Sequence, residues 1–159
     1  MEKILLGADP WGFELKNAIK EHLKKKGFEI LDIGMHDSDK EMVYYDIAAT
    51  AAKKIQKGEA DKGILFCGTG MGVAIVANKF KGIYASVVES EYTAKMCKAV
   101  NNANIITMGG MIISTHKAKM AVDQWLVTKH TEGFDAKMAD FLKAALKEIS
   151  KIEDEIVKK

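Results

Sequence analysis

The residues best suited to chemistry lie at positions 67–72, where the sequence reads CGTGMG between an apolar run and a helical pattern. Alternating glycines allow positive φ angles and let a ligand approach the backbone closely. Successive backbone N–H groups can then hold a phosphate or the oxyanion of an enediolate. A thiolate at Cys67, beside the start of a helix, can serve as a general base. The alternative is a tight turn that begins with a small core cysteine.

Two familiar glycine-rich loops do not fit this segment. The spacing differs from a P-loop, and no Lys-Ser or Lys-Thr pair follows. A dinucleotide fingerprint belongs after the first strand, whereas this loop follows the third apolar run. The loop therefore predicts a small anionic or polyol ligand and no nucleotide cofactor.

Polar residues at other strand ends extend this prediction. Asp9 closes the first apolar run, where its carboxylate can bind substrate hydroxyls, orient a neighbour or cap the next helix. Asn101, Asn102 and Asn104 offer amides to a polyol, although asparagine also favours turns. Among the histidines, only His36 follows a strand closely enough to suggest catalysis. No pair of histidines or cysteines has metal-ligand spacing, so no metal is expected.

Short apolar runs alternate with helical patterns along the whole chain. This alternation predicts a parallel sheet with helices on both faces, a three-layer α/β/α sandwich of the doubly wound, Rossmann-like kind. Ligands in such sheets bind beyond the carboxyl ends of the strands, here after the first, third and fifth. The predicted strands are 4–8, 28–33, 63–66, 82–87 and 104–108, and the predicted helices are 13–26, 41–57, 73–79, 91–100, 115–128 and 135–158.

Composition restricts the class of protein and its ligands. The 159 residues fit one domain, 1–159, with 48% hydrophobic residues and a formal net charge of +2. Two cysteines, no long apolar run and no secretory leader pattern predict a cytoplasmic protein with reduced thiols. All 24 basic residues are lysines, spread along the chain, so we expect no nucleic-acid or membrane partner. Any bound anion must be held by lysine or by backbone N–H groups.

The sequence GILFCGTGMG at residues 63–72, followed by ANK at 77–79, resembles the signature of the ribose-5-phosphate isomerase B / galactose-6-phosphate isomerase family. The resemblance continues in order through about residue 133. Further matching segments are 7–9, 58–61, 101–104, 108–110 and 123–126. The resemblance implies a doubly wound dimer, or dimer of dimers, with sites between subunits.

The family resemblance also implies a reaction, the interconversion of aldoses and ketoses through a cis-enediolate without metal or cofactor. Cys67 matches the base that moves the proton between C1 and C2. Residues 68–72 match the loop that holds the enediolate oxygens, with Thr69 at the side-chain position. Asp9 and Asn101 match contacts to substrate hydroxyls. The implied substrate-binding set is Asp9, Pro10, Gly68, Gly70, Met71, Gly72, Val100, Asn101 and Lys137.

Departures from the family pattern point to an unusual substrate. Pro10 and Val100 stand where the family has histidines, and Met111 stands at an arginine position. Near two further arginine positions only Lys137 is basic. We therefore predict an isomerase for a small sugar or sugar phosphate other than ribose 5-phosphate, for example a four-carbon sugar that needs no ring opening. The alternatives are a subunit of a two-chain galactose-6-phosphate isomerase and a sugar-binding protein without turnover.

The last predicted helix, 135–158, carries an apolar face along its length. Its members are Phe141, Leu142, Ala145, Leu146, Ile149, Ile152 and Ile156. This face predicts a subunit interface that includes Leu142, Leu146 and Ile149. The alternative is that it covers the chain's own sheet.

Overall fold

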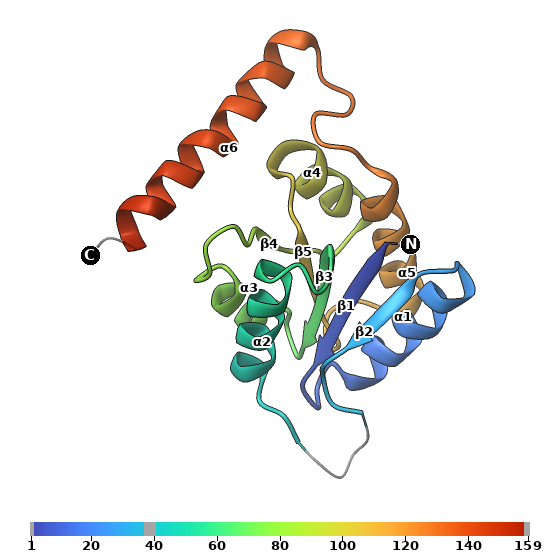
Figure 1. Ribbon diagram of the computed structural model, residues 1–159. Coiled ribbons are helices and arrows are strands. Elements are labelled where there is room, and N and C mark those ends of the chain that lie inside the picture. Colours follow the sequence, from blue (N-terminus) through green and yellow to red (C-terminus); the bar gives the residue numbers. More distant parts are fainter. Residues whose placement is uncertain (1, 37–40, 158–159) are drawn as a thin grey trace.

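The computed structural model describes residues 2–36 and 41–157, which form one parallel sheet and its covering helices (Figure 1). Its strands are β1 Lys3–Ala8, β2 Glu29–Asp32, β3 Lys62–Cys67, β4 Ala85–Val87 and β5 Ile105–Gly109. They lie in the order β2-β1-β3-β5-β4, and every paired strand is parallel. The central strands β3 and β5 are almost continuously buried, as expected for strands covered on both faces.

Helices cover both faces of the sheet, which confirms the predicted three-layer sandwich. The helices are α1 Phe13–Lys25, α2 Tyr44–Gln56, α3 Met71–Ala77, α4 Glu91–Asn101, α5 Thr115–Val127 and α6 Ala136–Val157. Apolar residues of α1, α4 and α5 form one core with the sheet, and those of α2 and α3 form the other. In the described residues, none of these helices is long and apolar enough to cross a membrane.

The loops at the carboxyl edge of the sheet pack directly against one another. Cys67 pairs with Gly109 in register, and the N–H of Gly110 donates to the Cys67 carbonyl at 2.9 Å. A Cβ on Gly109 would lie 2.6 Å from the backbone of Thr69, and one on Gly110 would lie 2.2 Å from the carbonyl oxygen of Trp11. Glycine at these positions lets the three loops that follow β1, β3 and β5 meet at one place.

Two predicted elements begin three residues before the observed ones, whereas the other predicted bounds differ from the observed ones by no more than two residues. The helix predicted from residue 41 begins at Tyr44, because Val43 before it has extended backbone angles. The strand predicted from residue 82 begins at Ala85, because the Asn104 side chain holds residues 82–84 as a loop. The polar loop predicted after β2 lies partly outside the described residues.

Strand β4 forms one edge of the sheet, and a side chain occupies its outer side. The Asn78 amide donates to the carbonyl of Ala85 at 2.8 Å and accepts from the N–H of Ala85, also at 2.8 Å. Asn78 is the residue that ends α3. The side chain of one residue thus pairs with this edge as a neighbouring strand would.

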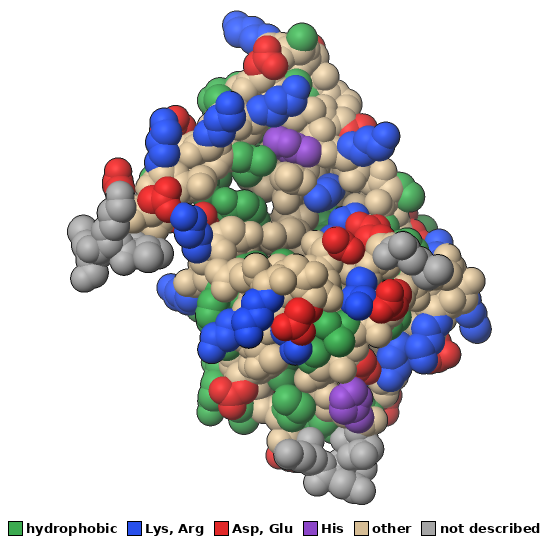
Figure 2. Space-filling view, viewed as in Figure 1, with side chains coloured by type: hydrophobic (Ala, Val, Ile, Leu, Met, Phe, Trp, Pro, Cys, Tyr) green, Lys and Arg blue, Asp and Glu red, His purple; other side chains and the backbone are tan. Residues whose placement is uncertain are grey.

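Helix α6 extends away from the sheet instead of covering it, so the alternative reading of its apolar face is wrong (Figure 1). Its last turns contact the body, where Glu153 accepts from the N–H of Gly82 and from the hydroxyl of Tyr84, and Asp154 pairs with Lys81. Figure 2 shows an opening between α6 and the body with hydrophobic side chains beside it.

The apolar residues of α6 are divided between the chain's own core and solvent. Leu142 is buried within the chain, so its predicted place in a subunit interface is wrong. Leu146 is half-buried. Phe141, Ile149, Ile152 and Ile156 remain exposed.

Candidate active site

A cleft of about 360 Å³ opens at the carboxyl edge of the sheet. It lies where the loops after β1, β3 and β5 meet the start of α2. Its lining residues are Asp9, Trp11, Tyr44, Cys67, Gly68, Thr69, Gly72 and Met111. The fold therefore brings together the predicted thiol, the predicted carboxylate and the glycine-rich loop.

Cys67 is the last residue of β3, and its side chain is buried at the floor of the cleft. Its Sγ accepts a hydrogen bond from the N–H of Gly70 at 3.1 Å. Gly70 has a φ of 77°, a left-handed conformation that suits glycine and turns the backbone toward the sulfur. The turn thus fixes the direction of the thiol toward the loop that follows it.

The second cysteine has a different environment, as the sequence predicts. Cys97 lies in α4, packs in the core and donates from Sγ to the carbonyl of Ala94. Burial raises the pKa of the Cys97 thiol to about 11. Cys97 is therefore an inert packing residue and a suitable control for Cys67.

Three side chains shape the mouth of the cleft above the glycine-rich loop. The Tyr44 ring leaves so little room that a Cβ on Gly72 would lie 2.8 Å from it. Met111 extends its Sδ over Gly68, 3.1 Å from where a Cβ would stand. The Thr69 hydroxyl accepts from the N–H of Met71 at 3.3 Å. Glycine at positions 68 and 72 therefore leaves room for the Met111 and Tyr44 side chains that form the walls of the cleft.

Asp9 lies directly after β1 and is 7% exposed in the cleft. Its Oδ1 accepts from the N–H groups of Trp11 and Gly12, at 3.0 and 3.1 Å. Burial raises the pKa of the Asp9 carboxyl, and these two hydrogen bonds oppose the shift. Gly12, not Asp9, is the residue that precedes α1. Asp9 therefore orders the turn before the helix and also presents a carboxylate to the cleft.

Several predicted site residues lie outside the cleft. Pro10 lines the neighbouring hollows, and Met71 is exposed at the start of α3. Val100 and Asn101 lie at the end of α4, just before β5 begins at Ile105. Strand β5 then runs to Gly109, which pairs with Cys67, so Val100 and Asn101 lie at the opposite end of the sheet from the cleft. Lys137 lies in the first turn of α6, far along the chain from the cleft loops.

Sequence reasoning missed Tyr44, since it considered only the loops after the first, third and fifth strands. Strand β2 is parallel to β1 and ends at the same edge of the sheet. The predicted parallel topology therefore indicated that the segment after β2 also lies near the cleft. His36 does not line the cleft. Its side chain is 65% exposed, with Nδ1 3.8 Å from Asp32.

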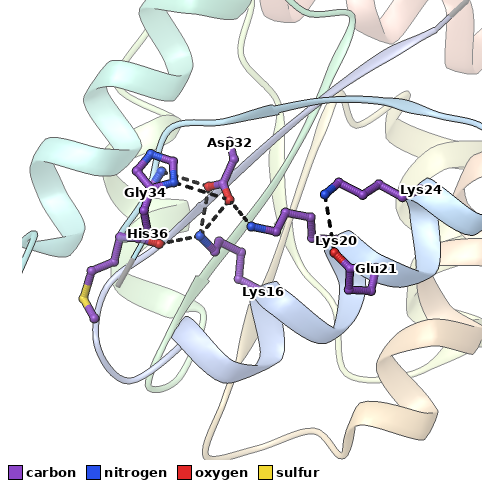
Figure 3. A network of polar contacts seen from close by, with 8 residues as sticks. Lys16, Lys20, Glu21, Lys24, Asp32, Gly34 and His36 are labelled. Atoms are coloured by element: carbon purple, nitrogen blue, oxygen red, sulfur yellow. Dashed lines mark hydrogen bonds and ion pairs between the residues drawn. The ribbon is translucent and has the colours of Figure 1, made fainter. Parts of the chain in front are cut away.

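A buried ion pair joins α1 to the end of β2 (Figure 3). Lys16 of α1 is fully buried, and its Nζ lies 2.9 Å from both carboxylate oxygens of Asp32, while Lys20 donates to the same carboxylate. Burial alone would raise the pKa of Asp32, but the hydrogen bonds from both lysines hold it below its usual range. Lys16 also donates to the carbonyl of Met35, whose N–H donates to Ala8, the residue before Asp9.

The fold and the cleft define a doubly wound α/β enzyme with a thiol, a carboxylate and a glycine-rich loop at one strand edge. The sequence profile of the Ribose/Galactose Isomerase family matches residues 4–142. The chain belongs to this family and is an isomerase. The predicted family membership and fold are thereby confirmed.

Relatives of known function agree with this assignment. The chain is 45% identical over 157 residues to the 4-deoxy-4-sulfo-D-erythrose isomerase of Clostridium sp. strain MSTE9, covering 99% of each chain. It is 37% identical to the D-erythrulose-4-phosphate isomerase of Pectobacterium atrosepticum, covering 86% of this chain and 90% of the relative. The structure of ribose-5-phosphate isomerase B from Clostridium thermocellum superposes with a TM-score of 0.88 at 35% identity, covering 97% of this chain and 99% of that one.

Proposed function

We propose that this protein interconverts the aldose and ketose forms of a four-carbon sugar that carries an anionic group on C4, with 4-deoxy-4-sulfo-erythrose as the first candidate. The observation that carries the proposal is the cleft in which the Cys67 thiol faces the glycine-rich loop beside Asp9. The similarity to a sulfo-erythrose isomerase along the whole chain supports the choice of substrate.

In the proposed mechanism the Cys67 thiolate removes the proton from C2 of the aldose. The electron pair of the C2–H bond forms the C1=C2 double bond, and the carbonyl oxygen on C1 takes the negative charge. Backbone N–H groups of residues 68–72 and the Thr69 hydroxyl stabilise this enediolate, and Asp9 accepts from a substrate hydroxyl. Transfer of the O2 proton to O1 and return of the abstracted proton from Cys67 to C1 give the ketose.

The two departures from the family pattern suit a four-carbon substrate. Pro10 and Val100 have no side-chain proton to give, so neither can open a sugar ring. A tetrose substituted at C4 cannot close a furanose through O4 and presents an open-chain aldehyde. The missing ring-opening donor is then no loss for such a substrate.

The proposed assembly is a homodimer, or a dimer of dimers, in which each site takes residues from two chains. Asn101, Val100 and Lys137 lie away from the cleft of their own chain, and α6 exposes Phe141 and Ile149. A second chain can bring these residues to the cleft. Sedimentation at micromolar concentration checks this, and a monomer with full activity would contradict it.

The test of the proposed reaction is turnover in deuterium oxide followed by proton NMR. The purified protein is given 4-deoxy-4-sulfo-erythrose, erythrose 4-phosphate, ribose 5-phosphate and galactose 6-phosphate. We expect isomerisation of the four-carbon sugars with exchange of solvent deuterium at the migrating position, and weak activity on ribose 5-phosphate.

Replacement of the base tests its role within the same assay. Cys67→Ala should lower kcat by at least ~10²-fold, since general base catalysis contributes about this much. Cys97→Ala is the matched control and should keep turnover. Near-normal turnover by Cys67→Ala would remove this thiol from the mechanism. Activity on galactose 6-phosphate only in the presence of a second related chain would favour the two-chain alternative.

A further inference from the structure

Three hollows adjoin one another at the carboxyl edge of the sheet, and all three are lined by Trp11. One is the cleft itself, one lies toward the start of α2, and one lies between the starts of α1 and α5. Asp9 lines the cleft and the hollow toward α2, Glu41 also lines the hollow toward α2, and Glu14 lines the hollow between α1 and α5. Among the described lining residues there is no lysine or histidine, so the charged side chains that line these hollows are all carboxylates.

The remaining lining residues at the mouth are uncharged. Trp11 is 69% exposed and Met111 66% exposed, and the sequence contains no arginine to form a bidentate contact with an anion. In the described parts of the chain, Asp9 receives hydrogen bonds only from backbone N–H groups and no salt bridge. An anionic substrate therefore meets carboxylates and neutral walls when it approaches this cleft.

We propose that this cleft selects a substrate whose terminal group carries one negative charge, a sulfonate, over one whose terminal group carries two, an ionised phosphate monoester. The inference rests on the proposed function, because it concerns the C4 substituent of the same substrate. Every carboxylate near the cleft repels a dianion about twice as strongly as a monoanion.

The ionisation of phosphate gives this selection a pH signature. A phosphate monoester loses its second proton with a pKa of about 6, whereas a sulfonate keeps a single charge over the whole range in which proteins are folded. Below about pH 6 the two end groups carry nearly the same charge. Selection by charge should therefore weaken as the pH falls and strengthen as it rises.

Titratable groups of the protein act on both ligands, in proportion to the charge that each ligand carries. Those that face the cleft and its neighbouring hollows are Asp9 after β1, Glu14 on α1, Glu41 before α2, Tyr44 on α2 and Cys67 on β3. Their ionisation changes the affinity for each ligand, and it changes the ratio of the two affinities only where the two ligands differ in charge. The ratio is therefore the quantity to measure.

The experiment measures binding of two ligands that cannot isomerise, 4-deoxy-4-sulfo-erythritol and erythritol 4-phosphate. Calorimetric Kd values are collected with the full-length protein from about pH 5.5 to about pH 8, a range that spans the second pKa of phosphate. We expect the Kd ratio of phosphate to sulfonate to be close to one at the acid end. Above pH 6 it should rise by up to about tenfold per pH unit, until the dianion itself binds.

A charge-adding variant sharpens the test. Met111→Arg places a guanidinium over Gly68 at the mouth, and it should lower the Kd ratio at about pH 8 by roughly tenfold, since an added cation favours the dianion. Met111→Gln is the matched control of similar length without charge, and its ratio should follow that of the unmodified protein. Thermal unfolding of both variants verifies that they fold.

The outcomes separate the inference from the proposed function. A Kd ratio that stays constant with pH, one that falls as the pH rises, or a failure of both ligands to bind would overturn the charge selection. A ratio that rises as expected, together with no turnover of either four-carbon sugar, would support the selection and contradict the isomerase activity proposed above.

Discussion

Two aspartates stand at the carboxyl ends of the adjacent strands β1 and β2 and have opposite surroundings. Asp32 ends β2 and is held by Lys16 and Lys20, with its pKa below the usual range. Asp9 follows β1 and, within the part of the chain that the structure describes, receives hydrogen bonds only from backbone N–H groups, and burial raises its pKa. One carboxylate is neutralised by the fold, whereas the other remains available to a ligand.

The two aspartates have different roles in this sheet: the ion pair of Asp32 holds the backbone in place, and Asp9 faces the cleft. Lys16 donates to Asp32 and to the Met35 carbonyl, and its own N–H donates to the carbonyl of Gly12, so it ties β2 to the turn that Asp9 orders. The buried pair fixes positions more than it adds stability, because desolvation offsets much of its Coulomb energy. Asp9 can then face the cleft in a backbone that its neighbour holds in place.

The largest expected effect comes from removing the neutralised carboxylate. Asp32→Ala leaves the fully buried Lys16 ammonium with Met35 as its remaining hydrogen-bond partner. Loss of one member of a buried pair costs about 3–5 kcal/mol in the free energy of unfolding. Urea denaturation measures this loss. A decrease of less than about 1 kcal/mol in the free energy of unfolding, as is typical of exposed ion pairs, would show that water hydrates the Lys16 ammonium in the variant.

The corresponding change at the ligand-facing carboxylate should act on catalysis. Asp9→Asn keeps an oxygen acceptor for the N–H groups of Trp11 and Gly12 and removes the charge. A hydrogen bond to a charged group contributes about 1.5–3 kcal/mol, so kcat/KM should fall roughly 10- to 100-fold. Steady-state kinetics measures the fall, and an unchanged urea midpoint is the control for folding. An unchanged kcat/KM would mean that the Asp9 side chain only orders the turn before α1 and does not contact the substrate.

The pH dependence of stability should distinguish the two groups by sign. The lowered pKa of Asp32 means that its stabilisation is complete above the unfolded value of about 3.9 and is lost as the pH falls below it. The raised pKa of Asp9 means that its ionisation costs stability as the pH rises above about 3.9 toward the folded value.

Unfolding free energies measured from about pH 3 to about pH 6 check these signs, since this range spans the unfolded pKa of aspartate. Asp32→Asn should flatten the rise of stability with pH, and Asp9→Asn should remove a fall. The same slope change in both variants would contradict the comparison.

The smallest effect is expected from Lys16→Met. Methionine fills a similar volume in the core, and Asp32 keeps Lys20 at 2.9 Å. The free energy of unfolding should change by less than about 1.5 kcal/mol, because Asp32 keeps an ion-pair partner in Lys20 and the volume of the core is nearly conserved. Urea denaturation of Lys16→Met and Asp32→Ala under the same conditions measures and compares the two changes in the free energy of unfolding. A loss as large as that of Asp32→Ala would show that the lysine side of the pair also determines stability.

The sequence predicted most of this architecture because its signals are local. Apolar runs and helical spacing located each strand and helix, and the glycines at positions 68, 70 and 72 marked the loop beside Cys67. The strand order and the burial of Lys16 depend on long-range packing, which leaves no local pattern. Tyr44 reaches the cleft only because β2 and β3 end at the same edge of the sheet.

The sequence indicated the lining residues of the cleft that one loop contains, and it was less informative where the topology separates the candidate residues. The roles of these residues stay predictions. Asp9 and Cys67 meet because β1 and β3 are neighbours in register. Val100 and Asn101 precede β5, which carries the chain to the cleft, so the same topology places them at the other end of the sheet. The periodicity of the sequence does not predict whether the end of α4 contacts a cleft, or in which chain that cleft would lie.

The Asn78 side chain on the outer side of β4 has a consequence for how molecules of this protein meet. An uncovered edge strand offers its N–H and carbonyl groups to any passing strand and invites continuous sheets and aggregation. Here the Asn78 amide already occupies both groups of Ala85. The amide of a single residue therefore obstructs growth of the sheet through the β4 edge in the folded chain.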